Sequence, residues 1–299
     1  MSDSVTGVSQ RPNLSVTIPV RNGASTLALA LSSIPAAVGE LSYEVIVIDG
    51  GSSDGSLEIA RRCGCTVIQG DHKLLAARRL GVKASSAPVV VLLDADQILC
   101  EGSLAQAVQA INEGAEIVAL GERVWRPTTA FQRWSDADKQ LIEMNVASQL
   151  DPMRGVILPR VFDRQIINGA FEAIPLECDS YVIAMDHAMV CYEASRLSNR
   201  VDYVPSAVFH NEPKSIFDVW AKNYRYGKSI AVQRRQKSYV ELITAKNRRL
   251  LSSKGPIRLK WRSIFFLAAK APAYFLGEAI GRRPKHSRSL LGPPSVESN

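Results

Sequence analysis

The sequence of 299 residues contains little cysteine, and the cysteines are scattered rather than paired. No two of them have the two-residue gap of a CxxC motif; they are Cys63, Cys65, Cys100, Cys178 and Cys191. Disulfide-rich secreted domains have even numbers of cysteines at regular spacings, and zinc sites use close pairs. We therefore expect reduced thiols, with neither a disulfide framework nor a structural zinc site.

Other familiar signals are also missing. Residues 1–13 are polar and lack the basic start and apolar core of a secretory leader, which predicts a cytoplasmic protein. Neither GxGxxG nor GxxxxGK[ST] occurs, so neither a dinucleotide site nor a P-loop is supported. The longest apolar stretch, at 262–283, is interrupted by Lys270, Pro272 and Glu278, so it is not a clean membrane-spanning helix.

Acidic residues become scarce toward the end of the chain. From residue 214 onward there are 19 Lys and Arg but only 4 Asp and Glu, whereas the preceding part has 17 against 25. A basic segment attached to an acidic body predicts contact with an anionic partner. No nucleic-acid-binding module is recognisable, so we expect no nucleic acid and consider an anionic membrane surface or a protein partner instead.

Strand and helix signals alternate through the first 125 residues. The sequence predicts strands at 14–20, 43–49, 65–70 and 88–96, with helices at 25–38, 56–64 and 73–87 between them. This alternation indicates a mostly parallel sheet flanked by helices. Ligands of such sheets bind beyond the carboxyl ends of the strands. The clusters RNG, DGGSSDG and DAD, which follow three of these strands, should therefore converge on one crevice.

Two aspartates one residue apart end the apolar run VVVLLDADQI. Carboxylates this close raise each other's pKa unless a cation lies between them, and Mg²⁺ or Mn²⁺ would also bind phosphate oxygens. Asp94 and Asp96 are therefore either a metal and phosphate site or incidental acids of a solvated loop. Asp186 begins an apolar helix, either because the helix dipole favours it there or as a general base. His210 ends a strand and is a candidate metal ligand.

These segments together resemble the family 2 glycosyltransferases, which are inverting enzymes of the GT-A fold. The resemblance covers residues 14–211, through LSVTIPVRNGASTL, YEVIVIDGGSSDGSLEIA and AARRLGVKASSAPVVVLLDAD, with a looser match around Asp186 and His210. It implies a Rossmann-like GT-A domain over 1–212, followed by a basic helical extension over 213–299. It also implies a UDP-, GDP- or dTDP-sugar donor, a glycan or lipid-linked acceptor, and Mn²⁺ or Mg²⁺ as cofactor.

The resemblance assigns roles to individual residues. Arg78 would reach the base or the diphosphate, and Asp94 would contact the ribose or the metal. Asp96 would bind the metal with His210 as a further ligand, and Asp186 would be the catalytic base. The residues implied to bind the donor nucleotide are Pro19, Val20, Arg21, Asn22, Asp49, Arg78, Asp94 and Ala95.

The sequence departs from the family pattern at three points. Gly50 stands where the family often has a second aspartate after Asp49, and Met185 stands where it often has an acid before Asp186. The QxxRW signature of processive synthases is absent, which favours transfer of a single sugar. The resemblance thus implies metal-dependent, inverting transfer of one sugar to a hydroxyl or phosphate, for a cell-envelope polysaccharide or glycolipid.

Alternatives remain at this point. VVVLLDADQ also resembles the nucleophile strand of haloacid-dehalogenase-type phosphatases, although Gln97 and the position far from the N-terminus count against it. A third hypothesis is a degenerate transferase fold that has no catalytic activity and acts only as a binding protein. The basic extension either lies on the inner face of the plasma membrane or packs on the body or on a second subunit.

Overall fold

The structure is a computed structural model that describes residues 11–146, 159–245 and 255–282. Within these ranges eight strands form one sheet in the order β3-β2-β1-β4-β7-β6-β8-β5. The strands are β1 Leu14–Val20, β2 Tyr43–Asp49, β3 Thr66–Gln69, β4 Val89–Leu92, β5 Gln97–Leu99, β6 Ile117–Val124, β7 Pro159–Asp163 and β8 Val201–His210.

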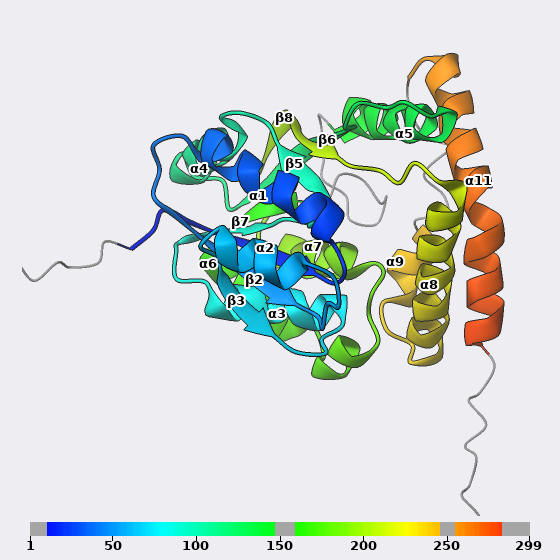
Figure 1. Ribbon diagram of the computed structural model, residues 1–299, viewed down its shortest axis with the longest axis horizontal. Helices are drawn as coiled ribbons and strands as arrows, with labels where there is room; N and C mark the ends of the chain where they lie inside the picture. Colours follow the sequence, from blue (N-terminus) through cyan, green and yellow to red (C-terminus); the bar gives the residue numbers. More distant parts are fainter. Residues whose placement is uncertain (1–10, 147–158, 246–254, 283–299) are drawn as a thin grey trace, which may run out of the picture.

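Helices cover both faces of the sheet and continue beyond its edge (Figure 1). They are α1 Ala24–Val38, α2 Ser56–Arg62, α3 Leu74–Ala84, α4 Ser103–Asn112, α5 Ala130–Val146, α6 Arg164–Ala173, α7 Asp186–Leu197, α8 Ile216–Arg235, α9 Val240–Ala245 and α11 Ile257–Gly281, with a short 3-10 helix at Leu176–Ser180.

The predicted parallel units are present in the first half of the chain. Strand β1 runs parallel to both β2 and β4, and β2 runs parallel to β3. The second half differs, because β7 is antiparallel to β4 and β6, and β5 is antiparallel to β8. The sheet is therefore mostly parallel around the predicted crevice and mixed beyond β4.

Two apolar cores hold the helices against the sheet. Val16 and Ile18 of β1 pack with Leu27 of α1 in the core on one face. The opposite core joins β4 to α3, α6 and α7. Gly81 lets α3 approach β1, because a Cβ at that position would lie only 2.9 Å from Thr17 Cβ. Burial on both faces explains why β4 reads VVVL without alternation; in β1, which is also buried throughout, Ser15 and Thr17 are buried between the apolar residues.

Helices α8 and α11 lie side by side, away from the sheet (Figure 1). A methyl group added at Gly227 of α8 would overlap the carbonyl of Tyr274, and one added at Gly277 of α11 would overlap the carbonyl of Tyr224. Only glycine allows two helix backbones to approach this closely. The two glycines therefore set how far α8 stands from α11.

Aromatic and polar contacts complete the attachment of α11. Trp220 of α8 donates its indole N–H to the carbonyl of Ala269 at 2.8 Å. The ring of Phe266 lies 5.1 Å from that of Phe131 on α5. Among the described helices, α11 is the one long and apolar enough to cross a membrane, by length and composition alone.

Candidate active site

The carboxyl ends of the central parallel strands lie at the same edge of the sheet. Val20 at the end of β1 is paired with Asp49 at the end of β2, and β4 ends alongside them. Three hydrogen bonds join the RNG and DGGSSDG loops: Asn22 N donates to Ser52 Oγ at 2.9 Å, and Ser53 donates to Asn22 Oδ1 through its N at 2.8 Å and its Oγ at 3.4 Å. The predicted convergence of these loops is confirmed, and the Asn22 side chain serves to connect them.

Asp49 has one satisfied and one unsatisfied carboxylate oxygen. Its Oδ1 accepts hydrogen bonds from Gly51 N at 2.9 Å and Ser52 N at 2.8 Å. Its Oδ2 is buried and has no hydrogen-bond partner within the described ranges. A buried acceptor without a partner costs about 1–3 kcal/mol, so this oxygen is suited to receive a donor group from a ligand.

A tight turn presents the two aspartates that follow β4. Gln97 N donates to Asp94 O at 3.0 Å, and Asp94 N donates to Gln97 Oε1 at 2.9 Å. The Gln97 amide also donates to Glu122 Oε1 at 2.9 Å, which fastens the turn to β6. Gln97 is therefore a buried brace of the loop that carries Asp94 and Asp96.

Arg78 joins two of the predicted acids. From α3, its Nε donates to Asp186 Oδ2 at 2.5 Å, and its Nη2 donates to Asp94 Oδ1. The side chain is 1% exposed, and Nη1 has no hydrogen-bond partner among the described residues. Three segments that are far apart in the sequence thus meet at one guanidinium. Its Nη1 amino group remains without a hydrogen-bond partner in the part of the chain that the structure describes.

The pKa of both acids is lowered. Burial by itself would raise the pKa of Asp94, but the charges of Arg78 and then Arg160 outweigh it and hold that pKa well below its usual range. Burial would likewise raise the pKa of Asp186, but the charge of Arg78 outweighs it and lowers that pKa below its usual value. Both carboxylates are therefore ionised at neutral pH.

Arg160 is a second buried cation that sequence reasoning missed. Its Nη1 donates to Asp94 Oδ2 at 3.1 Å and lies 2.6 Å from His187 Nε2, and its Nη2 donates to Glu122 Oε1 at 2.5 Å. Burial, followed by the charges of Arg78 and Arg160, lowers the pKa of His187, so its ring is neutral. Arg78 and Arg160 together occupy both oxygens of Asp94.

Asp96 lies between a histidine and a lysine. Its Oδ1 is 3.5 Å from His210 Nε2, and its Oδ2 is 3.6 Å from Lys222 Nζ. On the far side of the ring, His210 Nδ1 is 3.5 Å from Glu212 Oε1. Nδ1 has no hydrogen-bond partner among the described residues, so Glu212 contributes its charge rather than a hydrogen bond to the ring. Asp96 and His210 are thus close enough to share an ion.

A complete protein cage for a metal is not present in the part of the chain that is described, since no three His, Cys, Asp or Glu side chains are grouped there as a metal site. Mg²⁺ and Mn²⁺ do not require one, because one or two carboxylates plus substrate phosphates commonly hold them. Asp96 and His210, backed by Glu212, fit this second arrangement.

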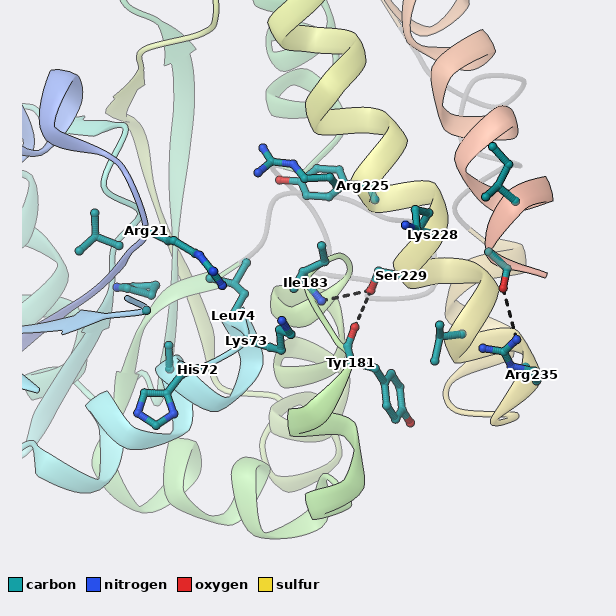
Figure 2. A pocket seen from close by; sticks show the side chains of 18 residues that line it. Arg21, His72, Lys73, Leu74, Tyr181, Ile183, Arg225, Lys228, Ser229 and Arg235 are labelled. Carbon is teal, nitrogen blue, oxygen red and sulfur yellow. Dashed lines mark hydrogen bonds between the residues drawn. The ribbon is translucent and has the colours of Figure 1, made fainter. Parts of the chain in front are cut away.

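A large cavity of about 1170 Å³ extends from the strand edge to α8 and α11 (Figure 2). Its wall includes Pro19, Val20 and Arg21, three of the residues that the resemblance implies for the donor site, whereas its described lining does not include the other five, Asn22, Asp49, Arg78, Asp94 and Ala95. Arg21 and Arg225 approach from opposite sides (Figure 2). None of the described residues that line the cavity is Asp or Glu, whereas six are basic or histidine: Arg21, His72, Lys73, Arg225, Lys228 and Arg235. The cavity is suited to an anion.

Helix α8 contributes side chains that sequence reasoning did not assign to the site. Burial by itself would lower the pKa of Lys222, but Tyr226, Asp96 and Glu212 outweigh it and raise that pKa, so the ammonium stays charged. In the sequence Lys222 lies between the aromatic residues Trp220 and Tyr224, a pattern typical of an ordinary helix surface. The sequence therefore gives no local signal for its role. For Arg160 a signal exists, because a charge inside the apolar run LPRVF needs a buried partner.

The sequence matches the family model of glycosyl transferase family 2 over residues 15–175. The chain therefore belongs to this family and is a glycosyltransferase. This membership sets aside the haloacid-dehalogenase alternative.

Individual relatives match smaller parts. Over 149 residues the chain is 35% identical to the glycosyltransferase AglE of Haloferax volcanii, covering 46% of this chain and 49% of that protein. Over 120 residues it is 32% identical to the undecaprenyl-phosphate 4-deoxy-4-formamido-L-arabinose transferase of Aeromonas hydrophila, covering 37% of each. The chain thus matches half or less of the length of these curated relatives.

Solved structures support the fold. The chain is similar to S. aureus TarS in complex with UDP, with a TM-score of 0.52 at 16% identity, over 85% of this chain and 70% of that one. It is also similar to glucosyl-3-phosphoglycerate synthase of Mycobacterium tuberculosis in complex with Mn²⁺ and UDP, with a TM-score of 0.52 at 18% identity, over 79% and 80%. The predicted GT-A fold is therefore confirmed.

Proposed function

We propose that this glycosyltransferase moves a single sugar, with inversion, from a nucleotide-sugar donor to an acceptor hydroxyl or phosphate. The observation that carries the proposal is the meeting of Asp94 and Asp186 on Arg78, beside a basic cavity. Asp94 follows β4, on the side proposed for the donor, and Asp186 begins α7, on the side proposed for the acceptor. TarS and the synthase from M. tuberculosis, which share the fold, bind UDP.

In this proposal the donor nucleotide lies along the ends of β1 and β2. Pro19, Val20 and Arg21 form its wall, and the unsatisfied Oδ2 of Asp49 accepts a hydrogen bond from the base. The free Nη1 of Arg78 donates to the diphosphate. Asn22 shapes this wall through its loop contacts, while Asp94 and Ala95 border the ribose.

Asp96 and His210 would hold Mn²⁺ or Mg²⁺. The ion would neutralise charge on the departing nucleoside diphosphate. The charge of Glu212, 3.5 Å from His210 Nδ1, would favour a cation at this histidine, and the turn braced by Gln97 fixes Asp96. The synthase from M. tuberculosis, with the same fold, binds Mn²⁺ together with UDP.

Asp186 would act as the base that removes the proton of the acceptor hydroxyl as it attacks the anomeric carbon. It is ionised at neutral pH and held in one orientation by Arg78. A base that deprotonates the nucleophile on the face opposite the leaving group gives inversion of the anomeric centre. Arg78 keeps the two carboxylates of Asp94 and Asp186 together despite their repulsion.

The acceptor proposed is a glycan or lipid-linked molecule of the cell envelope, met at the inner face of the plasma membrane. Helix α11 exposes Trp261, Phe275 and Leu276 at 55%, 63% and 57%. An apolar helix face in a basic segment is suited to an anionic lipid surface. The relative from A. hydrophila is named for an undecaprenyl-phosphate acceptor.

A transfer assay tests the proposed reaction. The protein is incubated with UDP-, GDP- or dTDP-sugars, Mn²⁺ and polyprenyl phosphate or glycan acceptors, and nucleoside diphosphate release and product anomeric configuration are measured. We expect release with inversion, loss with EDTA, and loss in Asp96→Ala but not in the exposed control Asp202→Ala. Product with retained configuration, or a complete lack of release with every donor, would contradict the proposal; the latter would favour a non-catalytic binding protein.

Flotation with phosphatidylglycerol vesicles tests the membrane proposal. Because α11 packs along α8, its surface residues are replaced rather than the helix deleted. The wild type should float, the variant with Phe275→Ser and Leu276→Ser should not, and Leu29→Ser, an exposed apolar residue of α1, should behave as wild type. Flotation of the double variant together with the wild type would exclude this face of α11 as the membrane contact, and failure of the wild type to float would instead favour packing against a second subunit.

A further inference from the structure

Helix α8 brings a lysine to the carboxylate that we assign to the metal. Lys222 Nζ lies 3.6 Å from one oxygen of Asp96, on the opposite side from His210. The two side chains are 29% and 28% exposed, so solvent screens the pair only in part. Asp96 therefore already has a cationic partner where an ion would bind.

A divalent ion at Asp96 would have to share the carboxylate with the ammonium of Lys222. Like charges at such distances repel, and the repulsion scales with the charge of the ion. Lysine carries its charge on a flexible four-carbon stem, so Nζ can move while the helix stays in place. Displacement of Lys222 therefore requires another anion within reach of that stem.

The donor diphosphate would supply such an anion. Arg225 and Tyr226, on the same helix as Lys222, line the basic cavity that begins at the ends of β1 and β2. Tyr226 is four residues after Lys222 and therefore lies on the same face of α8. The helix that carries Lys222 thus faces the cavity assigned to the donor.

We propose that Lys222 neutralises Asp96 in the free enzyme and shifts to the donor diphosphate when metal and nucleotide bind together. This inference rests on the donor and metal sites of the proposed function. The shift of Lys222 couples the binding of the two ligands. The ion alone must displace Lys222 from Asp96 without a replacement, whereas a diphosphate that binds with the ion gives Lys222 a new anionic partner. By linkage, each ligand then strengthens the binding of the other by the same factor.

Calorimetric binding of Mn²⁺ and UDP tests the inference without relying on turnover. GDP and dTDP replace UDP if the wild type prefers them. In Lys222→Met, which keeps the stem and removes the charge, we expect Mn²⁺ alone to bind at least tenfold more tightly than in wild type. We expect UDP in the presence of Mn²⁺ to bind at least tenfold more weakly, so that the coupling factor falls.

Two controls make the result specific. Lys83→Met removes the same charge from an exposed position on α3 and should change neither affinity. Lys222→Gln serves if Lys222→Met does not fold, and circular dichroism verifies both variants. Unchanged Mn²⁺ affinity or an unchanged coupling factor in the folded variant overturns the inference. Failure of the wild type itself to bind Mn²⁺ and any nucleoside diphosphate would instead overturn the proposed function.

Discussion

Replacing Asp186 by Asn should separate the structural and chemical roles of this residue. Oδ2 of Asp186 accepts a 2.5 Å hydrogen bond from Arg78 Nε. Hydrogen bonds to charged groups contribute about 1.5–3 kcal/mol and neutral ones about 0.5–1.5, so the free energy of unfolding should fall by about 1 to 2 kcal/mol. The loss should lie toward the lower end, because the substitution also removes the repulsion between Asp186 and Asp94.

The same substitution should reduce turnover far more than stability. A positioned general base accelerates a reaction by about 10² to 10⁴, which corresponds to about 3 to 5 kcal/mol of activation free energy. We therefore expect kcat of Asp186→Asn to fall by that factor, with KM for the donor changed by less than about threefold, because a base acts in the transition state. A continuous assay of nucleoside diphosphate release gives both constants, and urea unfolding gives the stability.

The chain offers a matched control on the adjacent residue of α3. Arg79 Nε donates to Asp179 Oδ2 at 2.7 Å, which is an ion pair of the same type outside the proposed site. Asp179→Asn should lose similar stability and keep kcat. If Asp186→Asn keeps kcat and raises only the donor KM, Asp186 acts by positioning Arg78, and the assignment as base is wrong.

The pH profile provides a second check on Asp186. A base must be ionised, and the pKa of Asp186 lies below its usual value of 3.8 because the charge of Arg78 outweighs the effect of burial. The acid limb that Asp186 contributes to kcat should therefore lie below pH 4, and kcat should not fall from this cause between pH 8 and 5. An acid limb centred near pH 6 that disappears in Asp186→Asn would refute the lowered pKa in the working enzyme.

Three further predictions concern the surroundings. Glu212→Gln should weaken Mn²⁺ binding by about 10- to 100-fold in calorimetry, because it removes a negative charge 3.5 Å from the proposed ligand His210; unchanged affinity would exclude that role. Gly277→Val should lower the free energy of unfolding in urea by about 1–3 kcal/mol, because the new side chain overlaps the carbonyl of Tyr224; a smaller loss would mean that α11 shifts freely. Stability should fall as the pH drops below 6.5, because the unfolded state binds a proton on His187 that the native state refuses; His187→Gln should remove the slope between pH 6.5 and 5.

The sequence predicted the first half of the fold well for a physical reason. Strands β1 and β4 are buried throughout and β2 is buried over its second half, so these strands are rich in apolar residues and each is followed by a polar loop. Beyond residue 125 the signal weakens, because β7 has only five residues and includes the charged Arg160. The antiparallel pairing of β7 with β4 and β6 depends on contacts between distant segments, which local patterns do not encode.

Some contacts of the candidate site could be predicted from the sequence and others could not. Arg78, Asp94 and Asp186 could be expected to lie near one another because the family pattern places them around the donor. The contact between Arg160 and Glu122 could not be expected. A charge in a buried strand requires a partner, but the sequence does not identify that partner. Their pairing spans 38 residues and is visible only once the sheet has formed.

The two parts of the chain on either side of the proposed boundary near residue 212 are in contact at the candidate site. The division into a GT-A domain and an extension stays a prediction, yet Lys222 of α8 lies 3.6 Å from Asp96 of the first part. The position of α8 is set in turn by α11, through the close approach at Gly227 and Gly277. Because α11 also carries the exposed apolar face, a lipid surface that shifts α11 would move the lysine beside the proposed metal site. Binding to a membrane and binding of the donor would then be linked through one pair of helices.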